Sequence, residues 1–113
     1  DRLATFLTEE GFAVRAIKGF GISEFDGPAG RKSERDIIDL GREVIGQARA
    51  DGSPAEGLLV SCGGLRTLGV AEPIEADPGV SVVASTPAAF RFAVRLAGHD
   101  GRYPGHGRLL AQA

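Results

Sequence analysis

Short runs of β-forming residues alternate with amphipathic segments along this chain of 113 residues. We expect strands at 13–17, 57–61 and 81–84, and helices at 2–10, 33–48, 67–76 and 86–97. The run at 57–61 is apolar and bounded by turn residues, which is typical of a strand buried on both faces. Helices and strands in this alternating order predict one α/β domain with a right-handed, parallel sheet and flanking helices.

Local end signals support several of these helices. Ser33 and Asp36 have the spacing of a capping box at the start of the longest helix. Thr86 is expected to cap the last helix, Pro87 to begin it and Gly98 to end it. Pro73 must lie in the first turn of the helix at 67–76 or kink it. Apolar stripes are expected to mark buried helix faces, at Ile37, Leu40, Val44, Ile45 and Ala48 and at Phe90, Ala93, Val94 and Ala97.

The first expected element is a helix, whereas a parallel α/β fold normally begins with a strand. The chain contains no methionine, so Asp1 is not a translation start. We therefore expect residues 1–113 to be a single, incomplete lobe of a longer protein, with at least one strand upstream of Asp1. A sheet without its leading strand exposes an edge or an apolar face, so we expect the isolated chain to be inactive.

Charge and composition argue against several classes of function. Thirteen basic and fifteen acidic side chains give a formal net charge of −2, without the basic patch of a nucleic-acid-binding protein. The longest aliphatic run, Leu58-Leu59-Val60, is too short for a membrane helix, and no signal peptide opens the chain, so we expect a cytoplasmic protein. A single cysteine cannot form an internal disulfide or a multi-cysteine zinc site, and no metal is expected.

Ligands of open parallel sheets bind at the carboxyl ends of the strands. Three loops are expected at that edge: Phe20 to Ser23, Ser61 to Gly64, and Ala84 to Thr86. Ser23, Ser85 and Thr86 are therefore candidate substrate-binding residues.

Cys62 lies between the strand expected at 57–61 and a helix, with a glycine pair directly behind it. A thiol near a helix N-terminus has a pKa lowered from its free value of about 8.5. The backbone N–H groups of Gly63 and Gly64 can approach an anion closely, which makes a carboxylate a plausible ligand. From position alone a second interpretation is equally open, in which Cys62 is a small buried residue and the glycines form a turn.

Other motifs are incomplete. The segment Gly19-Phe20-Gly21 lacks the third glycine of a dinucleotide-binding loop. The spacing from Cys62 to Arg66 is too short for the phosphate loop of tyrosine phosphatases. His99 and His106 fall in a polar, glycine-rich segment and are interpreted as surface residues, and Arg66 is interpreted as a solvated helix residue.

Several segments resemble arylmalonate decarboxylase, within the superfamily that includes aspartate/glutamate racemases, hydantoin racemase and maleate cis-trans isomerase. The most specific segment is Ser61-Cys62-Gly63-Gly64-Leu65, which is similar to the surroundings of that family's catalytic cysteine. The resemblance covers nearly the whole chain, in Gly57 to Leu65 with Thr67-Leu68, Val82 to Phe90, Ala93 to Gly98, Pro104 to Leu109, and upstream Arg2-Leu3-Ala4, Phe6-Leu7 and Gly21-Ile22-Ser23.

The resemblance implies one lobe of a two-lobed, racemase-like α/β fold, with the active site between the lobes and the missing N-terminal lobe as partner. It implies a cofactor-independent decarboxylase of 2-substituted malonates, in which Cys62 protonates an enediolate intermediate. The backbone N–H groups of Cys62 and Gly63 would hold carboxylate oxygens. Phe25 would lie near an apolar pocket for the departing carboxylate.

Two other functions fit the same residues. A racemase or maleate cis-trans isomerase of the same superfamily uses two cysteines, one on each lobe, on opposite faces of the substrate. A second cysteine in the other lobe would favour that function over decarboxylation. The third hypothesis is a non-catalytic carboxylate-binding module that keeps the fold alone, and release of carbon dioxide would exclude it.

Overall fold

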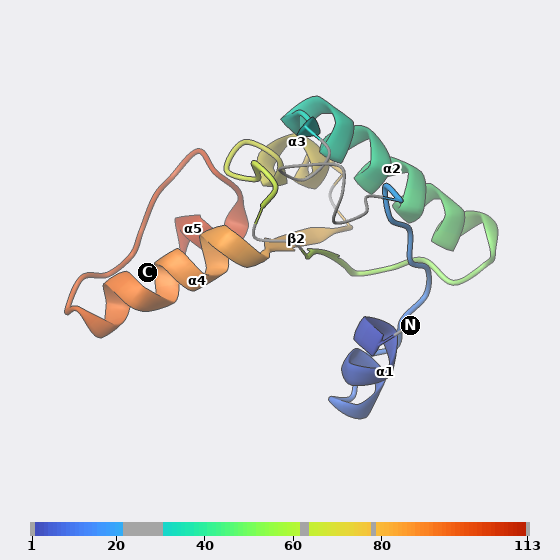
Figure 1. Ribbon diagram of the computed structural model, residues 1–113, viewed down its shortest axis with the longest axis horizontal. Coiled ribbons are helices and arrows are strands. Elements are labelled where there is room, and N and C mark those ends of the chain that lie inside the picture. Colours follow the sequence, from blue (N-terminus) through green and yellow to red (C-terminus); the bar gives the residue numbers. More distant parts are fainter. Residues whose placement is uncertain (1, 22–30, 62–63, 78, 113) are drawn as a thin grey trace.

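The computed structural model describes residues 2–21, 31–61, 64–77 and 79–112 (Figure 1). Its elements are, in order, α1 (Arg2–Glu9), α2 (Glu34–Ala50), β1 (Gly57–Val60), α3 (Ala71–Glu75), β2 (Ser81–Ala84), α4 (Ser85–Leu96) and α5 (Arg108–Ala111). The two strands pair in parallel, with Gly57 opposite Ser81 and Val60 opposite Ala84. The predicted α/β class with a parallel sheet and flanking helices is confirmed. No helix formed by the described residues is long and apolar enough to cross a membrane.

The core lies between one face of the sheet and helices α2 and α3, which lie together on that side (Figure 1). Val70, Ile74 and Val80 are the largest side chains that are fully buried there. On the opposite face, the paired residues Leu59 and Val83 are 40% and 39% exposed. The expectation that the strand at 57–61 is buried on both faces is therefore wrong for the described chain, because α2 and α3 cover only one face.

Helix α2 begins as the sequence predicts. The Ser33 hydroxyl accepts a hydrogen bond from the Asp36 N–H at 3.1 Å, and the Asp36 carboxylate accepts one from the Ser33 N–H at 3.0 Å. This reciprocal capping box satisfies two backbone donors that a helix start otherwise leaves unpaired. The predicted stripe faces the core, with Leu40 partly buried and the others buried: Ile37, Val44, Ile45 and Ala48.

The capping box predicts a pH dependence. The hydrogen bond from the Ser33 N–H lowers the pKa of the Asp36 carboxyl below its ordinary value of 3.8. A carboxyl with a lowered folded-state pKa stabilises the fold above its ordinary value, and this contribution disappears as pH falls through the lowered value. An NMR titration of the Asp36 carboxyl carbon should show the lowered pKa, which should rise part of the way back in Ser33→Ala. An Asp36 pKa equal to that of an unfolded peptide would contradict the assignment.

Residues 13–17 do not form the predicted strand. They follow α1 as an extended segment, and β1 and β2 make up the sheet found in the described part of the chain. A strand requires a neighbour to complete its ladder of backbone hydrogen bonds, and no described strand lies beside this segment. Figure 1 shows α1 standing apart from the sheet, with the extended segment rising from it to α2, and Phe12 and Ile17 are 63% and 47% exposed.

Two helix boundaries also differ from the prediction. Helix α3 begins at Ala71 rather than at residue 67, with Pro73 inside its first turn as expected. Helix α4 begins at Ser85 directly after β2, so Ala84 rather than Thr86 occupies the N-cap position. The end of α4 before Gly98 is confirmed, and Gly98 has a φ of 91°.

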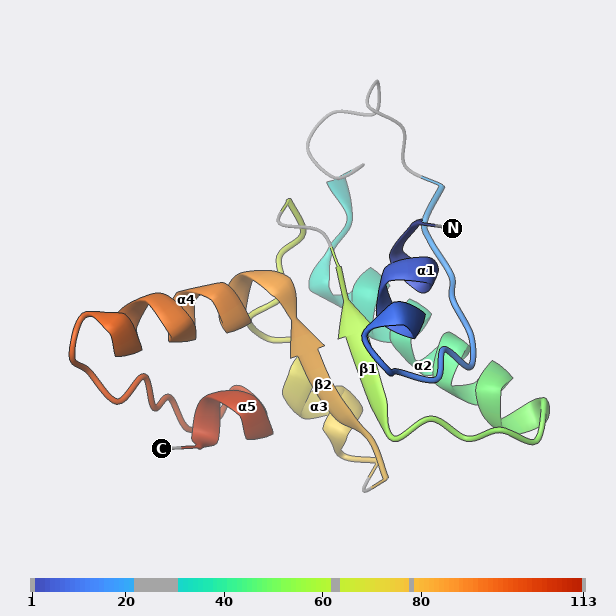
Figure 2. The same cartoon turned by 90° about the horizontal axis from the view of Figure 1, so that it is seen from below.

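The apolar stripe predicted on the last helix is not buried. No residue of α4 is buried, and Phe90 is 56% exposed. The reason is the direction of the helix, which leaves the end of β2 and extends away from the core (Figure 2).

Candidate active site

The carboxyl ends of both strands meet at one edge of the sheet. Val60 and Ala84 are paired, so the loop that begins at Ser61 and the helix that begins at Ser85 start side by side. Thr86 lies exposed in the first turn of α4, and Gly64 is exposed in the loop after β1. The structure thus brings three predicted site residues, Gly64, Ser85 and Thr86, to the same edge. Their roles remain predictions.

Four other predicted site residues, Cys62, Gly63, Ser23 and Phe25, lie outside the described residues. The described residues that flank Cys62 and Gly63 are Ser61 and Gly64, both exposed at the carboxyl end of β1. These four assignments also remain predictions.

The segment that follows Gly64 is held by burial at both ends. Leu65 packs against the core, and Thr67 and Val70 are 5% and 0% exposed. Between them, the Gly69 N–H donates a hydrogen bond of 2.5 Å to the Glu34 carboxylate on α2. These contacts hold the segment of residues 65–70 against the core and against α2.

The helix-dipole argument for the thiol assumes a helix close behind the glycine pair. The described helix that follows, α3, begins at Ala71, and Cys62 itself lies outside the described residues, so a lowered pKa of its thiol stays a prediction. Helix α4, with twelve residues, begins at the same sheet edge and has no side-chain cap hydrogen bond. Its N-terminal N–H groups, rather than those of α3, lie where they favour negative charge at this edge.

Lys32, in the segment that leads into α2, places its ammonium group over an aromatic ring at the margin of the core. The Lys32 ammonium lies 5.1 Å from the centroid of the Phe20 ring, and Phe20 itself packs against the core cluster. This cation–π contact joins the segment that follows α1 to the segment that precedes α2. Within the described ranges, no three histidine, cysteine, aspartate or glutamate side chains gather as a metal-binding group.

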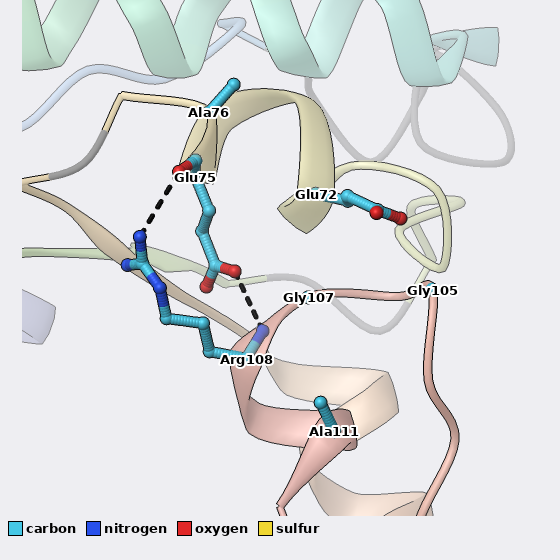
Figure 3. A pocket seen from close by; sticks show the side chains of 7 residues that line it. All are labelled: Glu72, Glu75, Ala76, Gly105, Gly107, Arg108 and Ala111. Atoms are coloured by element: carbon cyan, nitrogen blue, oxygen red, sulfur yellow. Dashed lines mark hydrogen bonds between the residues drawn. The ribbon is translucent and has the colours of Figure 1, made fainter.

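A pocket of about 430 Å³ lies elsewhere, between α3 and α5 (Figure 3). Glu75 lines it, and its carboxylate accepts hydrogen bonds from the Val82 N–H at 2.8 Å and the Arg108 N–H at 2.7 Å. The Arg108 guanidinium donates to the Val80 carbonyl at 2.6 Å and to the Glu75 carbonyl at 3.2 Å. None of the predicted site residues that the structure describes, Gly64, Ser85 and Thr86, lines this pocket. Because the side chains of Glu75 and Arg108 are hydrogen-bonded to the backbone, we interpret this pocket as a structural junction of α3, β2 and α5.

Sequence reasoning missed Glu34, Glu75 and Arg108. Their partners lie 35, 7 and 28 residues away along the chain. No periodicity or spacing marks such pairs, so only the folded structure reveals them.

A parallel sheet with helices packed against one face places the chain among α/β proteins, and its close structural match to arylmalonate decarboxylase gives it the racemase-like fold. The family model of arylmalonate decarboxylase matches residues 1–110. The chain belongs to the arylmalonate decarboxylase family.

Similar proteins agree with this assignment. The chain is 39% identical over 114 residues to arylmalonate decarboxylase from Bordetella bronchiseptica. This alignment covers 100% of this chain and 45% of that protein. A sulfate-associated structure of a glycine-to-cysteine mutant of arylmalonate decarboxylase superposes with a TM-score of 0.81 at 38% identity, covering 98% of this chain and 46% of the other. A structure of unliganded arylmalonate decarboxylase gives a TM-score of 0.79 at 39% identity, and the match covers 96% of this chain and 46% of that chain. The chain therefore spans less than half the length of these relatives.

Proposed function

We propose that the whole protein carrying this chain is a cofactor-independent decarboxylase of aryl-substituted malonates, with Cys62 as the proton donor. The family match over residues 1–110 carries the proposal, because it includes the loop after β1 in which Cys62 lies. The exposed carboxyl edge of the sheet supports it, since ligands of parallel sheets bind there.

The proposed reaction has two steps. Cleavage of the bond between the α-carbon and one carboxylate releases carbon dioxide and leaves the bonding electron pair in a planar enediolate. The Cys62 thiol then donates its proton to the α-carbon, and the resulting thiolate takes a proton from water. The proton and electron counts balance without an added oxidant or cofactor.

Backbone donors stabilise the charge that develops on the retained carboxylate. We assign this role to the N–H groups of Cys62, Gly63 and Gly64, with the hydroxyl groups of Ser85 and Thr86 across the same sheet edge. A donor aimed at a developing oxyanion contributes on the order of 3 kcal/mol in a site that excludes water. Phe25 and Ser23 are assigned to the side of the departing carboxylate, where an apolar surface favours loss of charge as carbon dioxide.

Incubation of the whole protein with phenylmalonate in D₂O tests the proposal. We expect carbon dioxide and a monocarboxylate with one deuteron at the α-carbon, detected by proton NMR, because the exchangeable thiol supplies the proton. Aspartate and glutamate serve as comparison substrates. Racemisation of either amino acid without decarboxylation of the malonate would contradict the proposal and favour a racemase. Binding of the malonate without carbon dioxide release would instead indicate a non-catalytic module.

A further inference from the structure

We propose that Glu34 is a positioning residue that holds the loop of residues 64–69 against the first turn of α2. The inference rests on the proposed function in one respect, namely that the N–H group of Gly64, where this loop begins, and those of the two residues before it are donors to the substrate carboxylate. Glu34 touches no substrate in this account. It acts through Gly69 and determines where the loop after β1 lies.

The contact joins two segments that are far apart in sequence. The Gly69 N–H donates to Glu34 Oε2 over 2.5 Å, across 35 residues. Glu34 is partly buried and directly follows Ser33, the N-cap residue of the capping box. The carboxylate therefore stands on a part of the backbone that the capping hydrogen bonds already fix.

The loop depends on such contacts for its course. Residues 64–70 form turns and irregular backbone rather than a helix or a strand, so no regular ladder of hydrogen bonds defines their path. Buried Thr67 and Val70 fix the inner part of the loop. The Glu34 contact fixes Gly69, which lies between these two residues and is itself exposed. Loss of the contact would release Gly69 and allow the course of the loop back to Gly64 to shift.

Gly69 shows that the contact is tight. Gly69 is not among the glycines with positive φ, so its backbone conformation is open to other residues. A Cβ atom there would lie 2.5 Å from Glu34 Oε2 and 3.1 Å from Glu34 Cδ. Alanine at position 69 would therefore displace the carboxylate without straining the backbone. The same contact can be broken from either partner.

The test compares Glu34→Ala, Gly69→Ala, the double variant and Glu34→Gln in the whole protein. Each single alanine variant should lower kcat for phenylmalonate by about tenfold with little change in KM, because misplaced donors weaken the transition state more than the ground state. The kcat of the double variant should be no lower than that of either single variant, because the two substitutions break the same contact. Glu34→Gln keeps an acceptor oxygen and should retain near-parental kcat. Asp39→Ala, which removes the exposed Arg35–Asp39 pair on the same helix, is the matched control.

A second measurement does not depend on turnover. The rate at which iodoacetamide alkylates Cys62 in the native protein should change severalfold, and by the same factor, in the two single alanine variants and their double, but not in Glu34→Gln or Asp39→Ala. If phenylmalonate is not decarboxylated yet this pattern appears, the proposed function fails and the positioning role stands. Additive effects of the two alanine substitutions, a Gln variant as impaired as Ala, or an unchanged alkylation rate in the single variants would overturn the positioning role.

Discussion

Replacement of Cys62 by serine is expected to reduce turnover of the whole protein by several orders of magnitude while the fold survives. Serine is close to cysteine in size, but its hydroxyl is a far weaker acid than a thiol and cannot replace it as proton donor to the α-carbon. The comparison requires kcat for phenylmalonate in both proteins, together with circular dichroism and thermal unfolding to establish that the fold is unchanged.

Ser61→Ala is the matched control for this substitution. Ser61 precedes Cys62 and is exposed at the end of β1, and no role in the reaction is assigned to it. The control should retain most of the parental activity. Near-parental turnover by the Cys62→Ser variant would show that the thiol is not the proton donor, and the mechanism proposed above would then be wrong.

The largest effect on stability is expected for Glu75→Ala. The Glu75 side chain is buried, and its two oxygens accept from the backbone N–H groups of Val82 and Arg108. Alanine would leave both donors without this acceptor, and an unsatisfied buried donor costs about 1–3 kcal/mol. We therefore expect the free energy of unfolding to fall by about 3 kcal/mol, measured by urea denaturation of the whole protein.

Glu72→Ala provides the control on the same helix. The Glu72 side chain is exposed, so its removal should change the free energy of unfolding by no more than about 0.5 kcal/mol. For Glu75→Gln, which keeps one acceptor oxygen, the change in the free energy of unfolding should lie between those of Glu75→Ala and Glu72→Ala. Equal midpoints for the Glu75→Ala and Glu72→Ala variants would show that the junction of α3, β2 and α5 contributes little to stability.

The elements that the sequence predicted well are those with local determinants. The capping box of Ser33 and Asp36, the core stripe of α2 and the glycine after α4 all act within a few residues, so a sequence pattern contains them. The strand at 13–17 failed for the opposite reason. Its β-forming residues are present, but a strand exists only beside a partner, and β propensity does not supply one.

The candidate site divides in the same way. The rule that parallel strands present their carboxyl ends at one edge correctly placed Gly64, Ser85 and Thr86 together. The contact of Glu34 with Gly69 and the network of Glu75 with Arg108 depend on tertiary packing, and no local pattern predicts them. The role of Cys62 rests on family resemblance rather than on any geometric rule.

The central claim, that Cys62 is a reactive thiol in a carboxylate site, is tested most directly by the rate of its alkylation in the native whole protein. Iodoacetamide labelling of the peptide containing Cys62 is followed by mass spectrometry across pH, with and without phenylmalonate. We predict that native Cys62 is labelled, that the labelling rate rises with a midpoint below the free-thiol value of about 8.5, and that phenylmalonate slows it. A Cys62 that is labelled only after unfolding, or whose labelling phenylmalonate does not affect, would contradict the claim.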